Sequence, residues 1–423
     1  MLLKQWNLLR KYTETLFSSY FVLNLYFSRK NKKKKKKMDR IKIGVIGVGV
    51  MGYAHCLSVK EIEESELTCV SDAAEGLARK RGEEFGVKYF TDYKELITSG
   101  LCDAVIVATP HWFHPEVSIF AFENGLHVLS EKPIAVTVSA ADKMIESAEK
   151  NNRVFAVMFQ KRTKYFVRKA KEIVDSGKIG EIIRTVCIDP WYRTQEYYDK
   201  DIWRGTWVGE GGGVLLTQAP HMIDIFTHLA GLPCKIEAKT RTKLHNIEVE
   251  DEVSAFLEYQ NGAWGYYYTS TCEPIGYYYN WEPVGPFYLE VSGDKGKIVI
   301  RGDQIAFYNY EAPLYETSME EFTKKIPNIW ELSTTPLKLE EGQIVPTSNF
   351  QTGHKEIIRN FVRSILYNEK LITPGKEGLK TIEFMNACLL SGKKNKVVNI
   401  PVDRKEYDDL MEELKKTSKA KNL

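Results

Sequence analysis

One short segment constrains the fold of this 423-residue chain more than any other. The apolar run Ile41 to Ile46 leads directly into Gly47-x-Gly49-x-x-Gly52, and a helix-like pattern follows. The first glycine permits a tight turn, the second lets a phosphate approach the backbone, and the third lets the helix pack closely on the strand. The segment therefore predicts a strand, a turn and a helix whose N-terminus can hold the pyrophosphate of a dinucleotide.

The alternation of strand and helix patterns continues to residue 160. The predicted strands cover residues 41–46, 67–71, 104–108, 127–129 and 154–159, and the predicted helices cover 50–63, 74–85, 115–124 and 140–150. These strands are apolar at nearly every position, so both faces of their sheet must be covered. We therefore expect an α/β fold whose N-terminal domain, residues 38–160, is a Rossmann-type, doubly wound parallel sheet.

Residues 161–403 follow a different pattern. After a helix at 167–176, the predicted strands cover 181–188, 235–242, 253–259, 263–271, 287–292 and 297–301. They are longer, alternate in polarity, and are joined by short polar turns, which predicts a C-terminal α+β domain with an open, mainly antiparallel sheet. One face of that sheet is free to meet a ligand or a partner subunit. Two amphipathic helices are expected at 354–367 and 377–390, and the charged tail 404–423 is expected to fray.

The first 37 residues differ from the rest in charge. They hold 11 Lys or Arg and one acidic residue, Glu14, whereas residues 38–423 hold 48 basic and 55 acidic side chains, a net of −7. The apolar stretch 16–27 is too short to span a bilayer, and most of the charge follows it, unlike a secretory signal. We expect translation to start at Met38; a disordered basic tail or a membrane-surface anchor is the alternative. The acidic body argues against a nucleic-acid partner.

Seven cysteines are scattered along the chain without a CxxC pair or a neighbouring histidine cluster. This pattern favours reduced thiols in the cytoplasm over a disulfide framework or a zinc site. We expect no bound metal.

Asp72 indicates which dinucleotide binds. It lies just after the second predicted strand, twenty residues beyond Gly52. A carboxylate there accepts hydrogen bonds from the ribose hydroxyls and repels a 2′-phosphate, so NAD is favoured over NADP. Arg79 and Lys80 lie near enough in sequence to keep NADP as the alternative.

Polar residues follow two more predicted strands, where a doubly wound sheet places its ligand. Thr109-Pro110-His111 follows one strand, and Glu131-Lys132-Pro133 follows the next. A lysine at this edge can hydrogen-bond a substrate hydroxyl beside the nicotinamide, or it can be an ordinary solvated surface lysine.

A run of three glycines, Gly211 to Gly213, introduces a further candidate segment. Thr217, His221 and Asp224 follow at spacings of four and three, so they share one face of a helix. His221 is a candidate general base with Asp224 as its orienter; the alternative is a structural histidine.

Four segments together resemble the Gfo/Idh/MocA family: GVIGVGVMG, TPHWFHPEVSIFAFENGLHVLSEKP, GGGVLLTQAPHMID, and HKEIIRNFVRSI with VVNIPVD. The resemblance runs from about Lys42 to Val402. It implies an NAD(P)-dependent oxidoreductase of sugars, cyclitols and their derivatives, assembled as a homodimer or homotetramer through the C-terminal sheet. It also implies that Lys132 positions and polarises the reacting hydroxyl and that His221 is the acid/base. Many members have Asp where this chain has Thr217, which removes a partner that would raise the pKa of the histidine.

The motifs and the resemblance give two catalytic candidates, Lys132 and His221. The cofactor candidates are Gly47, Gly49, Val50, Met51, Gly52, Asp72, Thr109, Pro110, His114, Glu131, Lys132 and Arg162. The substrate candidates are Lys132, Tyr192, Trp203, Arg204, Thr217, Gln218 and His221.

The expected reaction is hydride transfer between a secondary alcohol of a sugar, glycoside or cyclitol and the nicotinamide. One alternative is a glycoside hydrolase-like enzyme that oxidises C3 of the sugar only transiently and releases no net NADH. The other is a non-catalytic protein that senses NAD or sugar.

Overall fold

The computed structural model describes residues 40–273, 287–302, 304–310 and 350–419, with isolated positions 278, 279, 282, 283, 313, 315, 318 and 320. The predictions for the leader, residues 1–37, fall outside the described residues.

The N-terminal part contains the parallel sheet that the glycine segment predicted. Its strands are β1 (Ile41–Ile46), β2 (Ser65–Ser71), β3 (Lys88–Phe90), β4 (Ala104–Val107), β5 (His127–Ser130) and β6 (Phe155–Val157), in the order β3-β2-β1-β4-β5-β6. Every neighbouring pair is parallel. The connecting helices are α2 (Val50–Lys60), α3 (Glu75–Phe85), α4 (Tyr93–Thr98), α5 (Phe113–Glu123) and α6 (Val138–Lys150). The doubly wound prediction is confirmed.

Residues of β4 show why the sheet needs cover on both sides. Val105 and Val107 belong to one buried apolar cluster, and Ala104 and Ile106 belong to another. Alternate residues of a strand point to opposite faces, so both faces of this sheet are dry.

The C-terminal part is built on a mixed sheet of eight strands. They are β7 (Ile182–Pro190), β8 (Lys235–Arg241), β9 (Glu252–Glu258), β10 (Trp264–Ser270), β13 (Tyr288–Gly293), β14 (Gly296–Arg301), β15 (Gln304–Asn309) and β16 (Val398–Asn399). The order is β15-β14-β13-β7-β10-β9-β8-β16. Only β7 and β10 run parallel; the other pairs are antiparallel, as expected. Two short strands, β11 (Tyr278–Tyr279) and β12 (Glu282–Pro283), pair separately.

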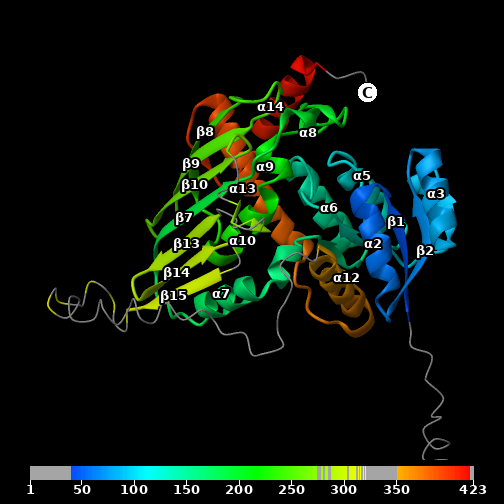
Figure 1. Ribbon diagram of the computed structural model, residues 1–423, viewed down its shortest axis with the longest axis horizontal. Coiled ribbons are helices and arrows are strands. Elements are labelled where there is room, and N and C mark those ends of the chain that lie inside the picture. The colour runs from blue at the N-terminus through cyan, green and yellow to red at the C-terminus, as the bar shows by residue number, and fades with distance from the viewer. Residues whose placement is uncertain are drawn as a thin grey trace, which may run out of the picture. The chain divides into compact units, whose positions relative to one another are not determined.

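Helices cover one face of the eight-stranded sheet. They are α7 (Tyr165–Asp175), α10 (Pro220–Ala230) and α13 (Gly375–Lys394), which lie beside the strands in Figure 1. Val253, Ala255 and Leu257 of β9 point to the covered face and are buried. Phe256 on the same strand points the other way and is 68% exposed. The sheet therefore has one dry face and one open face.

Two C-terminal helices bind the parallel sheet to the rest of the chain. α12 (Phe350–Tyr367) packs against α2, where Ile358 and Phe361 are completely buried in the apolar cluster that also holds Val59. α13 contacts both α6 and β8, so one helix touches both halves (Figure 1). The described residues from Ile41 onward accordingly form one compact unit.

Two expectations about the later part of the chain are wrong. Residues Arg404–Thr417 form a regular helix, α14, instead of a frayed tail: the Asp403 carboxylate caps its first turn, and Tyr407, Leu410 and Met411 are buried. The segment after the glycine run is not one helix either. It forms a single turn, α9 (Val214–Thr217), and α10 begins anew at Pro220.

Candidate functional site

The loop after β1 is shaped for close contact with a ligand. Gly47 has φ +83°, and a side chain there would lie 2.6 Å from the Ala108 carbonyl oxygen. A side chain on Gly52 would lie 1.8 Å from the Gly47 carbonyl oxygen, so only glycine fits. A side chain on Gly49 would meet no atom of the chain within 4 Å. Two glycines are thus required by the fold, whereas Gly49 keeps open the space into which a pyrophosphate fits.

Asp72 is held beside this loop. Its carboxylate accepts hydrogen bonds from the Val48 N–H at 2.9 Å and the Ala74 N–H at 3.0 Å. Val50 and Met51 open α2, and Val50 is 87% exposed. The carboxylate, the free helix N-terminus and the open space at Gly49 together fit a dinucleotide with an unmodified ribose.

His114 ties together the loops that follow β4 and β5. It is completely buried, and its Nδ1 and Nε2 each lie 2.8 Å from a carbonyl oxygen, of Pro133 and Thr109 respectively. Burial lowers the pKa of His114. The Thr109 hydroxyl is buried and has no hydrogen-bond partner among the described residues. Thr109-Pro110 and Lys132-Pro133 therefore sit at one edge of the sheet, as predicted from the strand ends.

Glu131 is paired with a histidine that the sequence had not singled out. His55, on α2, lies with its Nε2 2.7 Å from Glu131 Oε1, and both side chains are buried. Burial acts to raise the pKa of Glu131, but the hydrogen bond and charge of His55 lower it to about 2. The other carboxylate oxygen accepts the Lys132 backbone N–H at 3.1 Å. Glu131 thus fixes the backbone from which the Lys132 side chain projects.

Lys132 reaches from the parallel sheet to the segment after the glycine run. Its Nζ donates to the Thr217 carbonyl oxygen at 3.0 Å. Burial lowers the pKa of Lys132, and the positive charges of Arg204 and Lys161 act in the same direction. Lys132 and the turn α9, far apart in sequence, are therefore brought together.

Glu210, which the sequence did not single out, contacts the Thr217 side chain. The Thr217 hydroxyl donates to Glu210 Oε1, and the Gly205 N–H donates to Glu210 Oε2 at 2.7 Å. Glu210 is completely buried, and burial raises its pKa to about 7. The family resemblance leads us to expect an aspartate at position 217, whereas here the carboxyl group beside this position comes from Glu210, just before the glycine run. Its place beside that run was the only available signal.

His221 has few polar contacts. Its Nε2 lies 3.4 Å from the Gln160 side-chain nitrogen, and its Nδ1 has no hydrogen-bond partner among the described residues. Burial and the nearby positive charges of Lys132 and Lys161 hold the pKa of His221 well below its ordinary value. A neutral imidazole with a free nitrogen can accept a proton from a ligand.

The expectation that Asp224 orients His221 is wrong. Both Asp224 oxygens accept hydrogen bonds from the Arg162 guanidinium, at 2.8 and 2.6 Å, and both residues are buried. Arg162 also contacts Glu377 on α13 at 3.0 Å. The helix is interrupted between α9 and α10, and Asp224 is held in the buried ion pair with Arg162. The Asp224 carboxylate is therefore directed away from His221. Arg162 was predicted to bind the cofactor. Its guanidinium is instead paired with Asp224 and Glu377, which gives it a structural role.

The remaining substrate candidates lie on one wall of cations and aromatic rings. Arg204 stacks on Trp203 and Tyr197, with its guanidinium carbon 4.4 and 4.3 Å from the ring centres. The Gln218 amide donates to the Tyr197 hydroxyl at 2.9 Å, which links this wall to the turn that carries Thr217. Tyr192, four-tenths exposed, lies further out.

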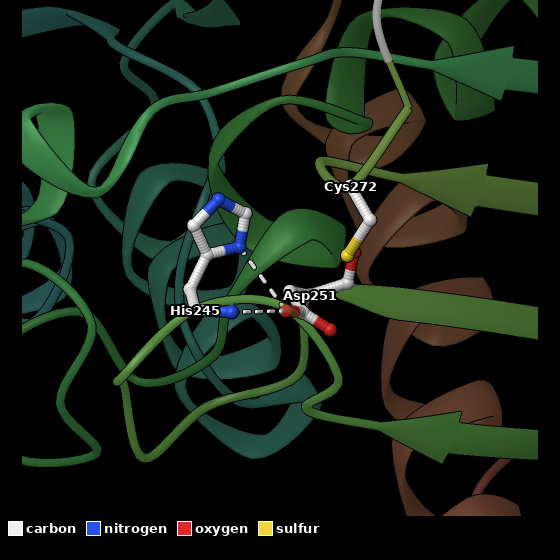
Figure 2. A group of neighbouring side chains, drawn as sticks. All are labelled: His245, Asp251 and Cys272. Atoms are coloured by element: carbon white, nitrogen blue, oxygen red, sulfur yellow. Dashed lines mark hydrogen bonds and ion pairs between the residues drawn. The ribbon is translucent and has the colours of Figure 1, made fainter.

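A second group of polar side chains lies just before the start of β9 and is drawn in Figure 2. His245, Asp251 and Cys272 place one ligand-type atom each within 4.8 Å of one another. The donors are already engaged: the Asp251 carboxylate accepts three backbone N–H groups and the His245 ring, and His245 Nε2 lies 2.8 Å from the Arg193 carbonyl oxygen. We interpret this group as an anchor for the loop at 243–251 and for the backbone of Arg193.

The fold and the site define a class. A Rossmann sheet with an open glycine loop, and a lysine and a neutral histidine converging from two halves of the chain, are the parts of a dinucleotide-dependent oxidoreductase.

The family follows from comparison with known proteins. Residues 41–159 match the family model described as "Oxidoreductase family, NAD-binding Rossmann fold", and residues 167–299 match the GFO/IDH/MocA C-terminal domain. The chain belongs to the Gfo/Idh/MocA family and is an NAD-dependent oxidoreductase.

Named relatives are similar over much of their length. Myo-inositol 2-dehydrogenase of Thermotoga maritima is 28% identical over 61% of this chain and 74% of its own. The NAD-dependent scyllo-inositol 2-dehydrogenase of Bacillus subtilis is 26% identical over 62% and 74%. The WlbA dehydrogenase of Chromobacterium violaceum, solved with NADH and UDP-GlcNAcA, superposes with a TM-score of 0.71 at 25% identity, over 87% of this chain and 98% of its own. In the part of this chain that the structure describes, no helix is both long and apolar enough to cross a bilayer.

Proposed function

We propose that this protein transfers a hydride between NAD and a secondary alcohol of a sugar, glycoside or cyclitol, with Lys132 and His221 as the catalytic residues. The observation that carries the proposal is the contact of Lys132 Nζ with the Thr217 carbonyl oxygen, four residues before His221. The positive charge of Lys132 also lowers the pKa of His221, which supports an ammonium and an imidazole lying near each other at the carboxyl ends of β4 and β5, where this fold binds ligands. The inositol dehydrogenases among its relatives support the substrate class.

The glycine loop and Asp72 would hold the dinucleotide, and Thr109, Pro110 and Glu131 line the neighbouring strand ends. Bound NAD supplies the hydride acceptor. A secondary alcohol is too weak an acid to lose its proton unaided, so His221 takes the hydroxyl proton on its free nitrogen. Lys132 hydrogen-bonds the same oxygen and stabilises its developing negative charge.

The Thr217–Glu210 contact supplies a carboxyl group where the family resemblance implies an aspartate. The Thr217 hydroxyl is committed to Glu210, so Thr217 contributes its carbonyl oxygen, which holds the Lys132 ammonium. Glu210 keeps that turn in position from behind. We propose that Glu210 is a positioning residue.

The test is a screen of sugars, glycosides and inositols that follows NADH absorbance, repeated with NADP. Lys132→Ala and His221→Ala should each lower kcat by about a hundredfold or more while NAD affinity stays nearly constant. Lys405→Ala, an exposed lysine on α14, and His228→Ala, further along α10, are matched controls. Unchanged turnover in both catalytic variants would refute the assignment.

We also propose that the open sheet face joins copies of this chain in a homodimer or homotetramer. Phe256 and Trp264, on β9 and β10, are 68% and 74% exposed on that face. Such a cluster is typical of an interface. Sedimentation equilibrium of wild type and Phe256→Asp tests this: the variant should be the smaller species.

The seven free thiols support a cytoplasmic location.

A further inference from the structure

Four cations surround the candidate substrate site, although residues 38–423 carry a net charge of −7. Lys132 follows β5, Lys161 lies in the 3-10 turn Gln160–Thr163, and Arg193 and Arg204 lie in the segment between β7 and α9. We call these four residues the cation cluster. Their side chains belong to separate stretches of the chain, so the folded structure brings them together.

Aromatic rings connect the members of the cation cluster. Lys161 Nζ lies 5.1 Å and the Arg193 guanidinium 5.7 Å from the Trp191 ring centre. Arg193 and Arg204 both lie on the Tyr197 ring, at 5.0 and 4.3 Å. The positive charges of Lys132 and Lys161 both act on His221 and lower its pKa. The cluster is therefore contiguous with the catalytic pair.

Three of the four cations have no carboxylate partner among the described residues. Among the described residues, no carboxylate lies within 4.0 Å of the charged nitrogens of Lys132, Lys161 or Arg193, whereas Arg204 contacts Asp201 at 2.7 Å. Glu131 and Glu210 attract Lys132, and Asp189 attracts Lys161. Glu131 is already hydrogen-bonded to His55, and burial raises the pKa of Asp189 and of Glu210 to about 7.

Two buried polar atoms beside the cluster have no hydrogen-bond partner among the described residues. Arg193 Nε is buried without an acceptor, and Gln218, only 7% exposed, has no partner for its Oε1 among the described residues. The Arg193 backbone is fixed from both sides, by Thr271 and by the His245 ring. Partly burying three cations without a carboxylate partner is costly unless a ligand supplies the opposite charge.

The cofactor does not supply that charge at this place. Its pyrophosphate fits the glycine loop after β1, and its oxidised nicotinamide is itself cationic. Lys161, Arg193 and Arg204 come from the C-terminal half of the chain instead. We propose that the substrate is an anionic sugar, a polyhydroxylated ring with a carboxylate or phosphate group that binds the cation cluster through Lys161 and Arg193. This rests on the proposed function, because it assigns the substrate class of the same site.

Matched pairs of substrates test the proposal. Initial rates of NADH formation are compared for D-glucuronate, D-glucose 6-phosphate and D-glucose, and for the corresponding galactose series. The expected result is a kcat/KM about 10- to 100-fold higher for an anionic sugar than for its neutral parent, the size of one or two charge-assisted contacts. The two anionic arms show whether the group is a carboxylate or a phosphate.

Two variants test which cations bind the anionic group of the sugar. Arg193→Gln and Lys161→Met should each lower the ratio of anionic to neutral kcat/KM by about tenfold or more. Arg168→Gln, an exposed arginine on α7, is the matched control and should leave the ratio unchanged. Equal kcat/KM for anionic and neutral sugars overturns the proposal while the dehydrogenase function stands.

A binding measurement separates the two proposals. Titration calorimetry of D-glucuronate and D-glucose 6-phosphate into the NADH-loaded protein should show binding that Arg193→Gln weakens. Binding without NADH formation from any sugar would refute the dehydrogenase function and leave the anion site intact. Absence of binding of both anions at millimolar concentration would overturn the anion site.

Discussion

Replacing Asp224 with asparagine tests the assignment of Arg162 to the framework of the protein. Arg162 is 3% exposed and Asp224 is completely buried, and two hydrogen bonds of 2.8 and 2.6 Å join them. Glu377 adds a third contact to the same guanidinium at 3.0 Å. The three residues hold the 3-10 turn Gln160–Thr163, α10 and α13 together.

The expected cost follows from leaving a buried charge without its main partner. Breaking a buried ion pair from one side costs about 3–5 kcal/mol. Glu377 still neutralises part of the charge, so we take the lower end for Asp224→Asn, about 3 kcal/mol, or roughly a 150-fold change in the folding equilibrium. The double variant Arg162→Met with Asp224→Leu removes both charges and should cost about 1 kcal/mol or less.

Urea unfolding followed by tryptophan fluorescence measures both costs, provided the m-values agree. Arg168→Met is the surface control, because its contact with Glu356 is 3.4 Å long and its side chain is 61% exposed. That variant should change the unfolding free energy by no more than about 1 kcal/mol. A cost below about 1 kcal/mol for Asp224→Asn would refute this reasoning. A large loss of NAD affinity in the folded double variant would restore Arg162 as a cofactor residue.

Three further predictions concern the loop, the base and a buried acid. Gly49→Ala should fold normally, because its side chain meets open space, yet lose NAD affinity in a fluorescence titration, whereas Gly52→Ala should fail to fold; normal NAD binding by Gly49→Ala would contradict the loop assignment. Lys161→Met removes a cation that lowers the pKa of His221, so the acid limb of the kcat/KM profile should move to higher pH; an unmoved limb would show that His221 is not the titrating base. Burial raises the pKa of Glu210 to about 7, so between about pH 4.5 and 7 the folded protein binds a proton that the unfolded chain releases. The free energy of unfolding that this proton contributes is complete below about pH 4.5 and is lost as the pH rises to 7. Glu210→Gln should remove that part of the pH dependence of urea unfolding, at most about 1.4 kcal/mol per pH unit, and an unchanged dependence would contradict it.

Local signals predicted the parallel sheet and its glycine loop. The turn at Gly47, the close packing at Gly52 and the carboxylate at Asp72 all act within a short stretch of chain, so their spacing alone indicates their roles. Residues at the ends of β4 and β5 were also predictable, because the carboxyl ends of parallel strands meet at one edge.

Contacts between distant segments were not predictable in the same way. Asp224 lies on the expected helix face relative to His221, yet a stronger partner, Arg162, lies 62 residues away in sequence. His55 likewise meets Glu131, 76 residues away, only in the folded chain. The helix α14 differs, since its signal was present: Asp403 and Glu406 form a cap, and Tyr407, Leu410 and Met411 recur at helical spacing.

The central claim is that Lys132 and His221 converge on one carbinol beside the nicotinamide. A crystal structure of the protein with NADH and an oxidisable sugar or inositol tests it most directly. The account predicts Lys132 Nζ and His221 Nδ1 both within hydrogen-bond distance of one substrate oxygen, with the carbon that bears this oxygen about 3–3.5 Å from nicotinamide C4. A nicotinamide ring bound where neither side chain can reach the same substrate atom would contradict it.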